Sequence, residues 1–178
     1  MAYQTVTTFT CRPNGWTPEV LKHPVMAFMH GLTKAWLETR SGHSEPYTNW
    51  MTDDFVLHSH TGKTCDSATT AKAFIALAKT YAAATININL AYIRETETGY
   101  EALMTGNLYI NFVVPGEKTC RDAEGRDWEL CIPRAYDFTL VRDKTGPAAG
   151  LKVSKMLIYG DRQPAIEIAA QRGLPAIF

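Results

Sequence analysis

The stretch Trp50–His60 reads WMTDDFVLHSH and separates two kinds of sequence pattern. A long apolar pattern of helical spacing precedes it, and after one further helical segment the chain is almost entirely strand-like. The stretch itself predicts a strand over 55–60. Because successive side chains of a strand point to opposite faces, His58 and His60 share one face. Such a pair is either part of a functional site or a polar outer surface, and the pattern leaves both open.

Segments on both sides of this stretch predict helices. Over 24–40 the apolar residues recur at helical spacing, and a proline occupies the first position, where its missing N–H costs nothing. Residues 45–51 predict a short second helix. The Ala-rich segment 68–84 predicts a third helix, with Ser67 or Thr69 as its N-cap.

From residue 85 onward the apolar period is two, which predicts strands. The expected strands cover 85–96, 100–114, 128–141 and 151–159, and a short terminal helix is expected over 165–172. On the strand 100–114, apolar residues such as Met104 and Leu108 share one face, while Asn107 and Tyr109 share the other. Helices followed by strands of this kind predict an α+β fold with helices against one face of a sheet.

The composition restricts the kind of protein. The 178 residues carry no formal net charge and no run of like charge, which argues against binding to nucleic acid or to an anionic membrane. No apolar run reaches the roughly 18 residues of a membrane span, and the first residues lack a signal-peptide pattern. Four scattered cysteines without a CxxC pair indicate reduced thiols. We expect a soluble, cytoplasmic, single-domain protein with an arm over 1–23, a domain over 24–172 and an apolar tail over 173–178.

Several segments together carry a family resemblance. They are the first helix, the strand entry at 53–56, the helix at 71–81, and the later segments 125–130, 135–138, 150–153 and 159–161. Their order resembles the NTF2-like superfamily, in particular its SnoaL-like group, which includes ketosteroid isomerase, scytalone dehydratase and limonene epoxide hydrolase. The resemblance implies a cone in which three N-terminal helices pack on a strongly curved, mixed, mainly antiparallel sheet that encloses a cavity.

The same resemblance implies a function. The extra N-terminal arm and the apolar tail are similar to those of fungal SnoaL-like enzymes of secondary metabolism. We therefore expect a cofactor-independent isomerase or cyclase that acts on a polycyclic polyketide, terpenoid or alkaloid intermediate, by general acid–base catalysis in an apolar cavity. Two alternatives stay open: a dehydratase of the scytalone-dehydratase type and a non-catalytic NTF2-like binding module. The expected partners are a small-molecule substrate and a second copy of the chain, because dimers are common in the fold.

Four residues are candidates for the acid–base chemistry. His58 and His60 are the side chains that titrate nearest to neutral pH. Tyr109 is suited to donate a hydrogen bond to a carbonyl or enolate oxygen. Asp137 is a carboxylate within an apolar strand, so it needs a partner or a raised pKa if it is buried. An outward-facing, solvated Asp137 is the alternative.

The family alignment adds a complication for the first strand. When Asp53 and Asp54 are aligned with the acidic pair that opens this strand in ketosteroid isomerase, that enzyme's catalytic aspartate falls on Ser59. Either Ser59 or the two histidines therefore face the cavity. The expected substrate-binding residues are the aromatic residues Trp36, Trp50 and Tyr81 and the polar residue Asn107, which are otherwise core or outer-surface residues. A His-x-His strand pair also suits a metal, but it needs further ligands that the sequence does not offer, so no metal site is expected.

Overall fold

The strands form one curved sheet with a single parallel contact. A computed structural model describes residues 8–13, 15–59, 62–146 and 149–175. Within these residues the sheet has the strand order β1-β4-β5-β8-β9-β2-β3, and it is open because β1 and β3 are its edges. All neighbours are antiparallel except β2 and β9. The strands are β1 (Thr8–Cys11), β2 (Met51–His58), β3 (Thr64–Asp66), β4 (Tyr81–Glu95), β5 (Gly99–Phe112), β8 (Leu130–Arg142) and β9 (Leu151–Tyr159). The expected α+β fold with a mixed, mainly antiparallel sheet is confirmed.

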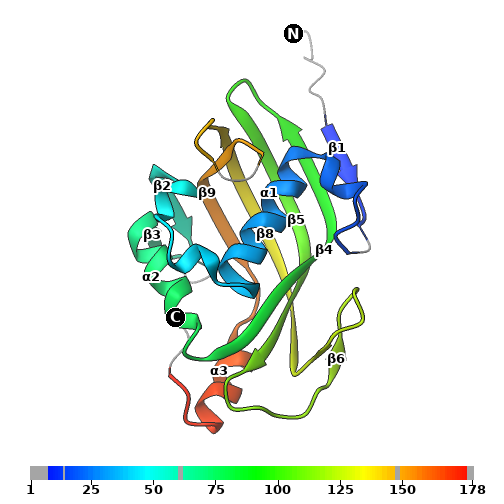
Figure 1. Cartoon of the computed structure of the whole chain (residues 1–178), viewed down its shortest axis with the longest axis vertical. Helices are drawn as coiled ribbons and strands as arrows, with labels where there is room; N and C mark the ends of the chain where they lie inside the picture. Colours follow the sequence, from blue (N-terminus) through cyan, green and yellow to red (C-terminus); the bar gives the residue numbers. More distant parts are fainter. Residues whose placement is uncertain (1–7, 14, 60–61, 147–148, 176–178) are drawn as a thin grey trace.

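The first helix packs its apolar side against the concave face of this sheet (Figure 1). Helix α1 (Pro24–Thr33) continues into the π-helical turn η2 (Lys34–Glu38), so the helix expected over 24–40 is confirmed. His23 caps its start, because the ring accepts a hydrogen bond from the Val25 N–H. Val25, Met26, Phe28 and Met29 are buried, as the apolar spacing requires. The remaining short turns are η1 (Val20–Lys22), η3 (Ser41–His43) and η4 (Tyr47–Asn49).

Helix α2 (Ser67–Leu77) is shorter than its sequence pattern suggests. The helix expected over 68–84 ends at Leu77, and Tyr81 already pairs with Phe112 of β5. Intrinsic helix propensity is overridden here by the sheet, since Val113 donates its N–H to the Thr80 carbonyl at 3.0 Å. The N-cap is Asp66 and neither of the two expected residues, because its Oδ1 accepts the Thr69 N–H at 2.7 Å.

A small hairpin packs on the convex side of the main sheet. Strands β6 (Cys120–Arg121) and β7 (Asp127–Trp128) pair with each other, and the Trp128 ring lies 6.2 Å from the ring of Tyr109 on β5. The side chain of Asp122 closes the turn, since it accepts hydrogen bonds from the Arg126 N–H and from the Trp128 indole, both at 2.8 Å. The hairpin therefore covers the face of β5 that carries Tyr109.

Helix α3 (Gln163–Gln171) lies at one end of the sheet (Figure 1). It agrees with the terminal helix expected over 165–172. Arg172 fixes this end of the chain, because it pairs with the buried Glu129 and donates to the Val114 carbonyl at 2.7 Å. Glu129 also accepts the Phe112 N–H at 3.2 Å.

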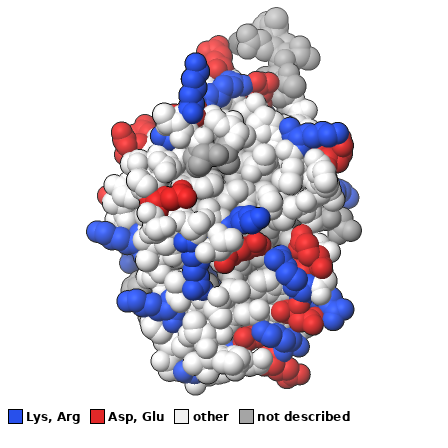
Figure 2. All heavy atoms as spheres, viewed as in Figure 1, with Lys and Arg blue, Asp and Glu red and all other residues white. Residues whose placement is uncertain are grey.

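The core consists of two clusters. The larger one lies between α1 and the sheet and includes Phe28, Met104 and Phe138. The smaller one lies where α3 meets the sheet and includes Ile110 and Phe112. No helix among the described residues is long and apolar enough to cross a membrane. Figure 2 shows acidic and basic side chains interspersed over the face seen in Figure 1, with no large area of one sign.

Candidate functional site

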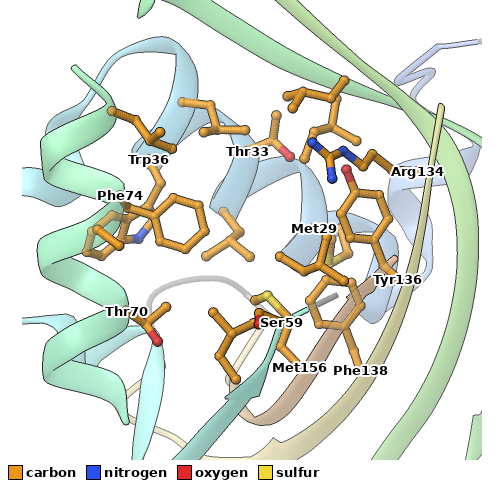
Figure 3. Close-up of a pocket in the computed structure, with 18 of the residues that line it drawn as sticks. Met29, Thr33, Trp36, Ser59, Thr70, Phe74, Arg134, Tyr136, Phe138 and Met156 are labelled. Atoms are coloured by element: carbon orange, nitrogen blue, oxygen red, sulfur yellow. The ribbon is translucent and has the colours of Figure 1, made fainter. Parts of the chain in front are cut away.

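A cavity of about 170 Å³ lies between helices and sheet, where residues of the two core clusters meet. Its walls come from α1, η2 and α2 on one side and from the concave face of the sheet on the other (Figure 3). Most lining side chains are apolar, among them Met29, Leu57, Phe74, Leu108, Phe138 and Met156. Such a space favours the burial of a compact apolar molecule.

The polar side chains of the lining lie in different parts of the cavity. Arg134 and Tyr136 project from β8, and in Figure 3 the Tyr136 hydroxyl points toward the Arg134 guanidinium. Ser59 and Thr70 are drawn on the other side of the space. The Thr70 hydroxyl is buried and has no hydrogen-bond partner. A ligand with polar groups at both ends of an apolar body matches this arrangement.

Arg134 is the most unusual residue of the lining. Arg134 is 7% exposed, and its Nη1 donates a hydrogen bond to the Gly160 carbonyl at 3.3 Å. Its Nε is buried and has no hydrogen-bond partner. Burial lowers the pKa of Arg134; the phenols of Tyr136 and Tyr81 oppose this shift, and the charge of Arg162 adds to it. The Arg134 side chain can pack against the backbone of residue 160 because that residue is glycine; a Cβ there would lie 2.6 Å from the Arg134 Cδ.

Two phenols complete the charged end of the cavity. Burial raises the pKa of Tyr81 to about 12, although the charges of Arg134 and Arg162 oppose the shift. Burial also raises the pKa of Tyr136 well above its usual value of 10, again against the effect of Arg134. Both phenols are therefore neutral hydrogen-bond donors at physiological pH. Arg162, which precedes α3, lines the same cavity, and burial lowers its pKa while Tyr81 opposes the change.

The aromatic residues expected to bind substrate divide into two groups. Trp36 and Tyr81 line the cavity. Trp50 does not: it is a core residue that packs on Phe28 with ring centroids 5.9 Å apart, and its indole donates to Glu45 at 3.3 Å.

The residues expected to carry the chemistry do not meet in this cavity. Leu57 near the end of β2 and Ser59 just after it line the cavity, so the His58 side chain between them points to the opposite face of the sheet. Asp137 likewise lies between the inward-facing Tyr136 and Phe138 and has the convex face. His60 lies outside the described residues.

Tyr109 and Asn107 lie on the convex face of β5. Tyr109 is buried under Trp128, and the Asn107 amide approaches its hydroxyl at 3.5 Å. Burial raises the pKa of Tyr109. Both residues are one step out of phase with Leu108, which lines the cavity, so strand alternation keeps them away from it.

The sequence interpretation missed the charged end of the cavity. One signal for it exists: Arg134 and Tyr136 are in phase with Ile132, Phe138 and Leu140, the buried face of β8. A charged residue in register with a buried apolar face indicates a functional site. Ser59, the position onto which the aspartate of ketosteroid isomerase aligns, does line the cavity. Among the described residues, no three His, Cys, Asp or Glu side chains gather as a metal-binding group.

Comparison with known proteins identifies the fold. No family model matches the sequence, and no curated protein matches it either. Solved structures do match. Nuclear transport factor 2 from Cryptosporidium parvum superposes with a TM-score of 0.54 and 12% identity, over 82% of this chain and 97% of that one. ActVI-ORFA from Streptomyces coelicolor gives 0.55 and 11%, over 80% and 98%. The CaMKII hub of S. rosetta gives 0.53 and 14%, over 78% and 95%. This chain has the NTF2-like fold.

Proposed function

We propose that the protein is a cofactor-independent isomerase or cyclase that acts on a small cyclic intermediate of natural-product biosynthesis. The observation that carries this proposal is the pair of donors, Arg134 and Tyr136, at one end of an otherwise apolar cavity. In such a low-dielectric space, fixed donors stabilise negative charge that develops on an oxygen far better than water does. A fold shared with ActVI-ORFA and with nuclear transport factor 2 is compatible with an enzyme and with a binding protein.

The chemistry follows from what the lining provides and lacks. A substrate carbonyl oxygen binds at Arg134 and Tyr136, which polarise the conjugated double bond next to it. No carboxylate and no imidazole lines the cavity among the described residues, so the substrate itself supplies the nucleophile. A substrate hydroxyl adds to the double bond and forms a C–O bond. Its proton passes through cavity water to the carbon of the resulting enolate, so the product has the mass of the substrate.

The cavity volume limits the substrate. An apolar cavity of about 150 Å³ holds a molecule of the size of benzene. At about 170 Å³, this partly open cavity has room for a single ring with small substituents. The expected polycyclic substrate therefore fits only if most of it stays outside the cavity, and a monocyclic substrate is the better match.

Two other functions use the same cavity. A dehydratase would polarise the same oxygen and then eliminate water, so its product would be lighter than the substrate by one water molecule. The absence of acid and imidazole groups from the described lining favours a third function, the binding of a small molecule without turnover. Mass analysis of the product separates the first two, and the absence of any turnover identifies the third.

The proposed reaction is tested with cyclohexenones that carry a hydroxyalkyl chain, because ring closure removes the enone absorbance. We expect Arg134→Met and Tyr136→Phe to lower kcat by about 10²–10³-fold, the usual effect of losing an oxyanion donor. Arg94→Met, at an exposed position that does not line the cavity, is the matched control and should retain the wild-type rate.

One outcome would move catalysis away from the cavity. If Asp137→Asn or Tyr109→Phe abolished turnover while Arg134→Met and Tyr136→Phe retained it, the reaction would take place on the convex side, and the proposed site would be wrong.

We also propose that the chain forms a homodimer through the convex face of its sheet. Leu103 is 53% exposed there and pairs with Tyr92 on β4, which is 48% exposed. Tyr159 on β9 is equally exposed. Large exposed apolar side chains on one sheet face are typical of a protein–protein contact.

A further inference from the structure

The charged residues that are buried in the described part of the chain are Asp122, Glu129 and Arg134. They differ in whether they have an ion-pair partner. Asp122 pairs with Arg126 at 2.6 Å, and Glu129 pairs with Arg172. Arg134 forms no ion pair with any described residue, and the hydrogen-bond acceptor it contacts is the neutral carbonyl of Gly160.

An unpaired buried guanidinium is costly. Even after relaxation, the removal of one ion from water costs several kcal/mol, and proteins normally recover this cost with an opposite charge. Asp161 attracts this charge but forms no salt bridge with it, since Asp161 is exposed and its carboxylate accepts the Gln163 N–H at 2.8 Å. Arg162 lines the same cavity and adds positive charge. The electrostatics of this end of the cavity therefore favour an anion.

The geometry specifies which anion. Nη1 of Arg134 donates to Gly160, while Nε is buried and has no hydrogen-bond partner. The Nε edge of the guanidinium presents parallel donors that match the two oxygens of a carboxylate. The neutral hydroxyl of Tyr136 provides a further donor beside it.

From these observations we infer that the ligand of this cavity is a compact, ring-bearing monocarboxylate. Its carboxylate binds the Nε edge of Arg134 and the Tyr136 hydroxyl, and its ring lies between Phe74 and Phe138. A hydroxyl or oxo substituent at the far end binds the Thr70 hydroxyl. This inference rests on the proposed function, and it names the carbonyl group of that reaction as a carboxylate conjugated to the reacting double bond. The end that binds is then also the end where negative charge grows during ring closure.

The test compares two probes of equal size. Benzoate and its neutral isostere benzamide are titrated into the protein by calorimetry. We expect benzoate to bind at least about tenfold more tightly, which corresponds to about 1.4 kcal/mol. Because Arg134 is buried, this preference should persist at 0.5 M salt, where surface charges are screened. Arg134→Met should abolish the preference, and Arg94→Met should leave it unchanged.

A second measurement places the probe. In NMR spectra with ¹⁵N-labelled protein, the Arg134 Nε–H signal should move downfield with benzoate and not with benzamide, because only a carboxylate forms the charge-assisted hydrogen bond. This readout uses the wild-type chain and does not depend on the folding of a variant.

The outcomes distinguish this inference from the proposed function. Equal binding of both probes, or a preference for benzoate that Arg134→Met retains, would overturn the carboxylate site. The proposed function would survive that result as long as the hydroxyalkyl cyclohexenones are turned over in an Arg134-dependent manner. If benzoate binds as expected while neither those compounds nor the matching hydroxyalkyl cyclohexenecarboxylates are turned over, the carboxylate site stands and the proposed function is overturned.

Discussion

At the scale of single residues, Arg134 and Arg172 are a contrasting pair. Both are arginines near the end of the molecule where α3 lies, and both contact a neighbouring carbonyl. Arg172 neutralises the buried Glu129, whereas Arg134 has no described counterion. Arg172 supports the fold, and Arg134 is the proposed ligand-binding group. A residue of the second kind commonly lowers stability in exchange for function.

This contrast predicts opposite effects of the same substitution. Arg134→Met removes an uncompensated buried charge, so we expect the free energy of unfolding to rise by about 1–3 kcal/mol while activity is lost. Arg172→Met leaves Glu129 buried with only Lys118 nearby, so a loss of about 2–3 kcal/mol is expected. Urea denaturation followed by circular dichroism measures both. A destabilised Arg134→Met variant would mean that this charge is already compensated in the free protein.

At the scale of elements, two buried carboxylates hold the convex hairpin and the α3 end of the molecule in place. Burial by itself would raise the pKa of Asp122, but hydrogen bonds from the Arg126 N–H, the Trp128 indole and the Arg126 side chain outweigh it, so the pKa is lowered. Burial likewise opposes the change at Glu129, where Arg172 and the Phe112 N–H lower the pKa. Each group is therefore more acidic in the folded than in the unfolded chain.

The sign of these shifts predicts acid sensitivity. A lowered pKa in the folded state contributes stability that is fully present above the usual values of 3.8 for Asp122 and 4.5 for Glu129. That stability is lost as the pH falls below these values and through the folded-state pKa. We expect Asp122→Asn to flatten the decline of unfolding free energy with falling pH below about 4. Urea titrations between pH 2.5 and 6 check this, and an unchanged slope would contradict it.

The elements also indicate how far sequence patterns reach. Strand phases are read well, because a half-buried strand keeps its apolar side chains at a period of two, and β5 and β8 follow this rule. The end of α2 is predicted too late in the sequence. Residues 78–84 suit a helix locally, but pairing with β5 requires a strand from Tyr81. A local pattern contains no information on that distant partner.

At the scale of the whole molecule, the cavity exists because the two core clusters do not close on each other. Trp36 and Tyr81 were expected to line such a space and do so. His58, Tyr109, Asp137 and Asn107 were expected at the site and lie on other faces of their strands. The alternation of apolar and polar residues shows which side chains of a strand share a face. The direction in which the sheet curves determines which of these faces lines the cavity.

The dimer is a prediction at this same scale. Light scattering should give twice the mass of the chain, and Leu103→Lys should shift the protein toward monomer, since a charge at the centre of an apolar contact is left unpaired. Val113→Lys, an exposed apolar residue beyond the end of β5, is the matched control and should remain dimeric. A monomeric wild-type chain would rule out the contact.

The sequence by itself determined the α+β class and the phases of the long strands, and its resemblance to a known family indicated the NTF2-like fold. The class and the phases depend on local periodicity, and the stretch Trp50–His60 already separates the helical part of the chain from the rest. Only the tertiary structure decided that Ser59 and not His58 faces the cavity, and that Arg134 lies buried there without a described counterion. Both facts depend on sheet curvature and on contacts between residues far apart in the chain, and no local pattern encodes them.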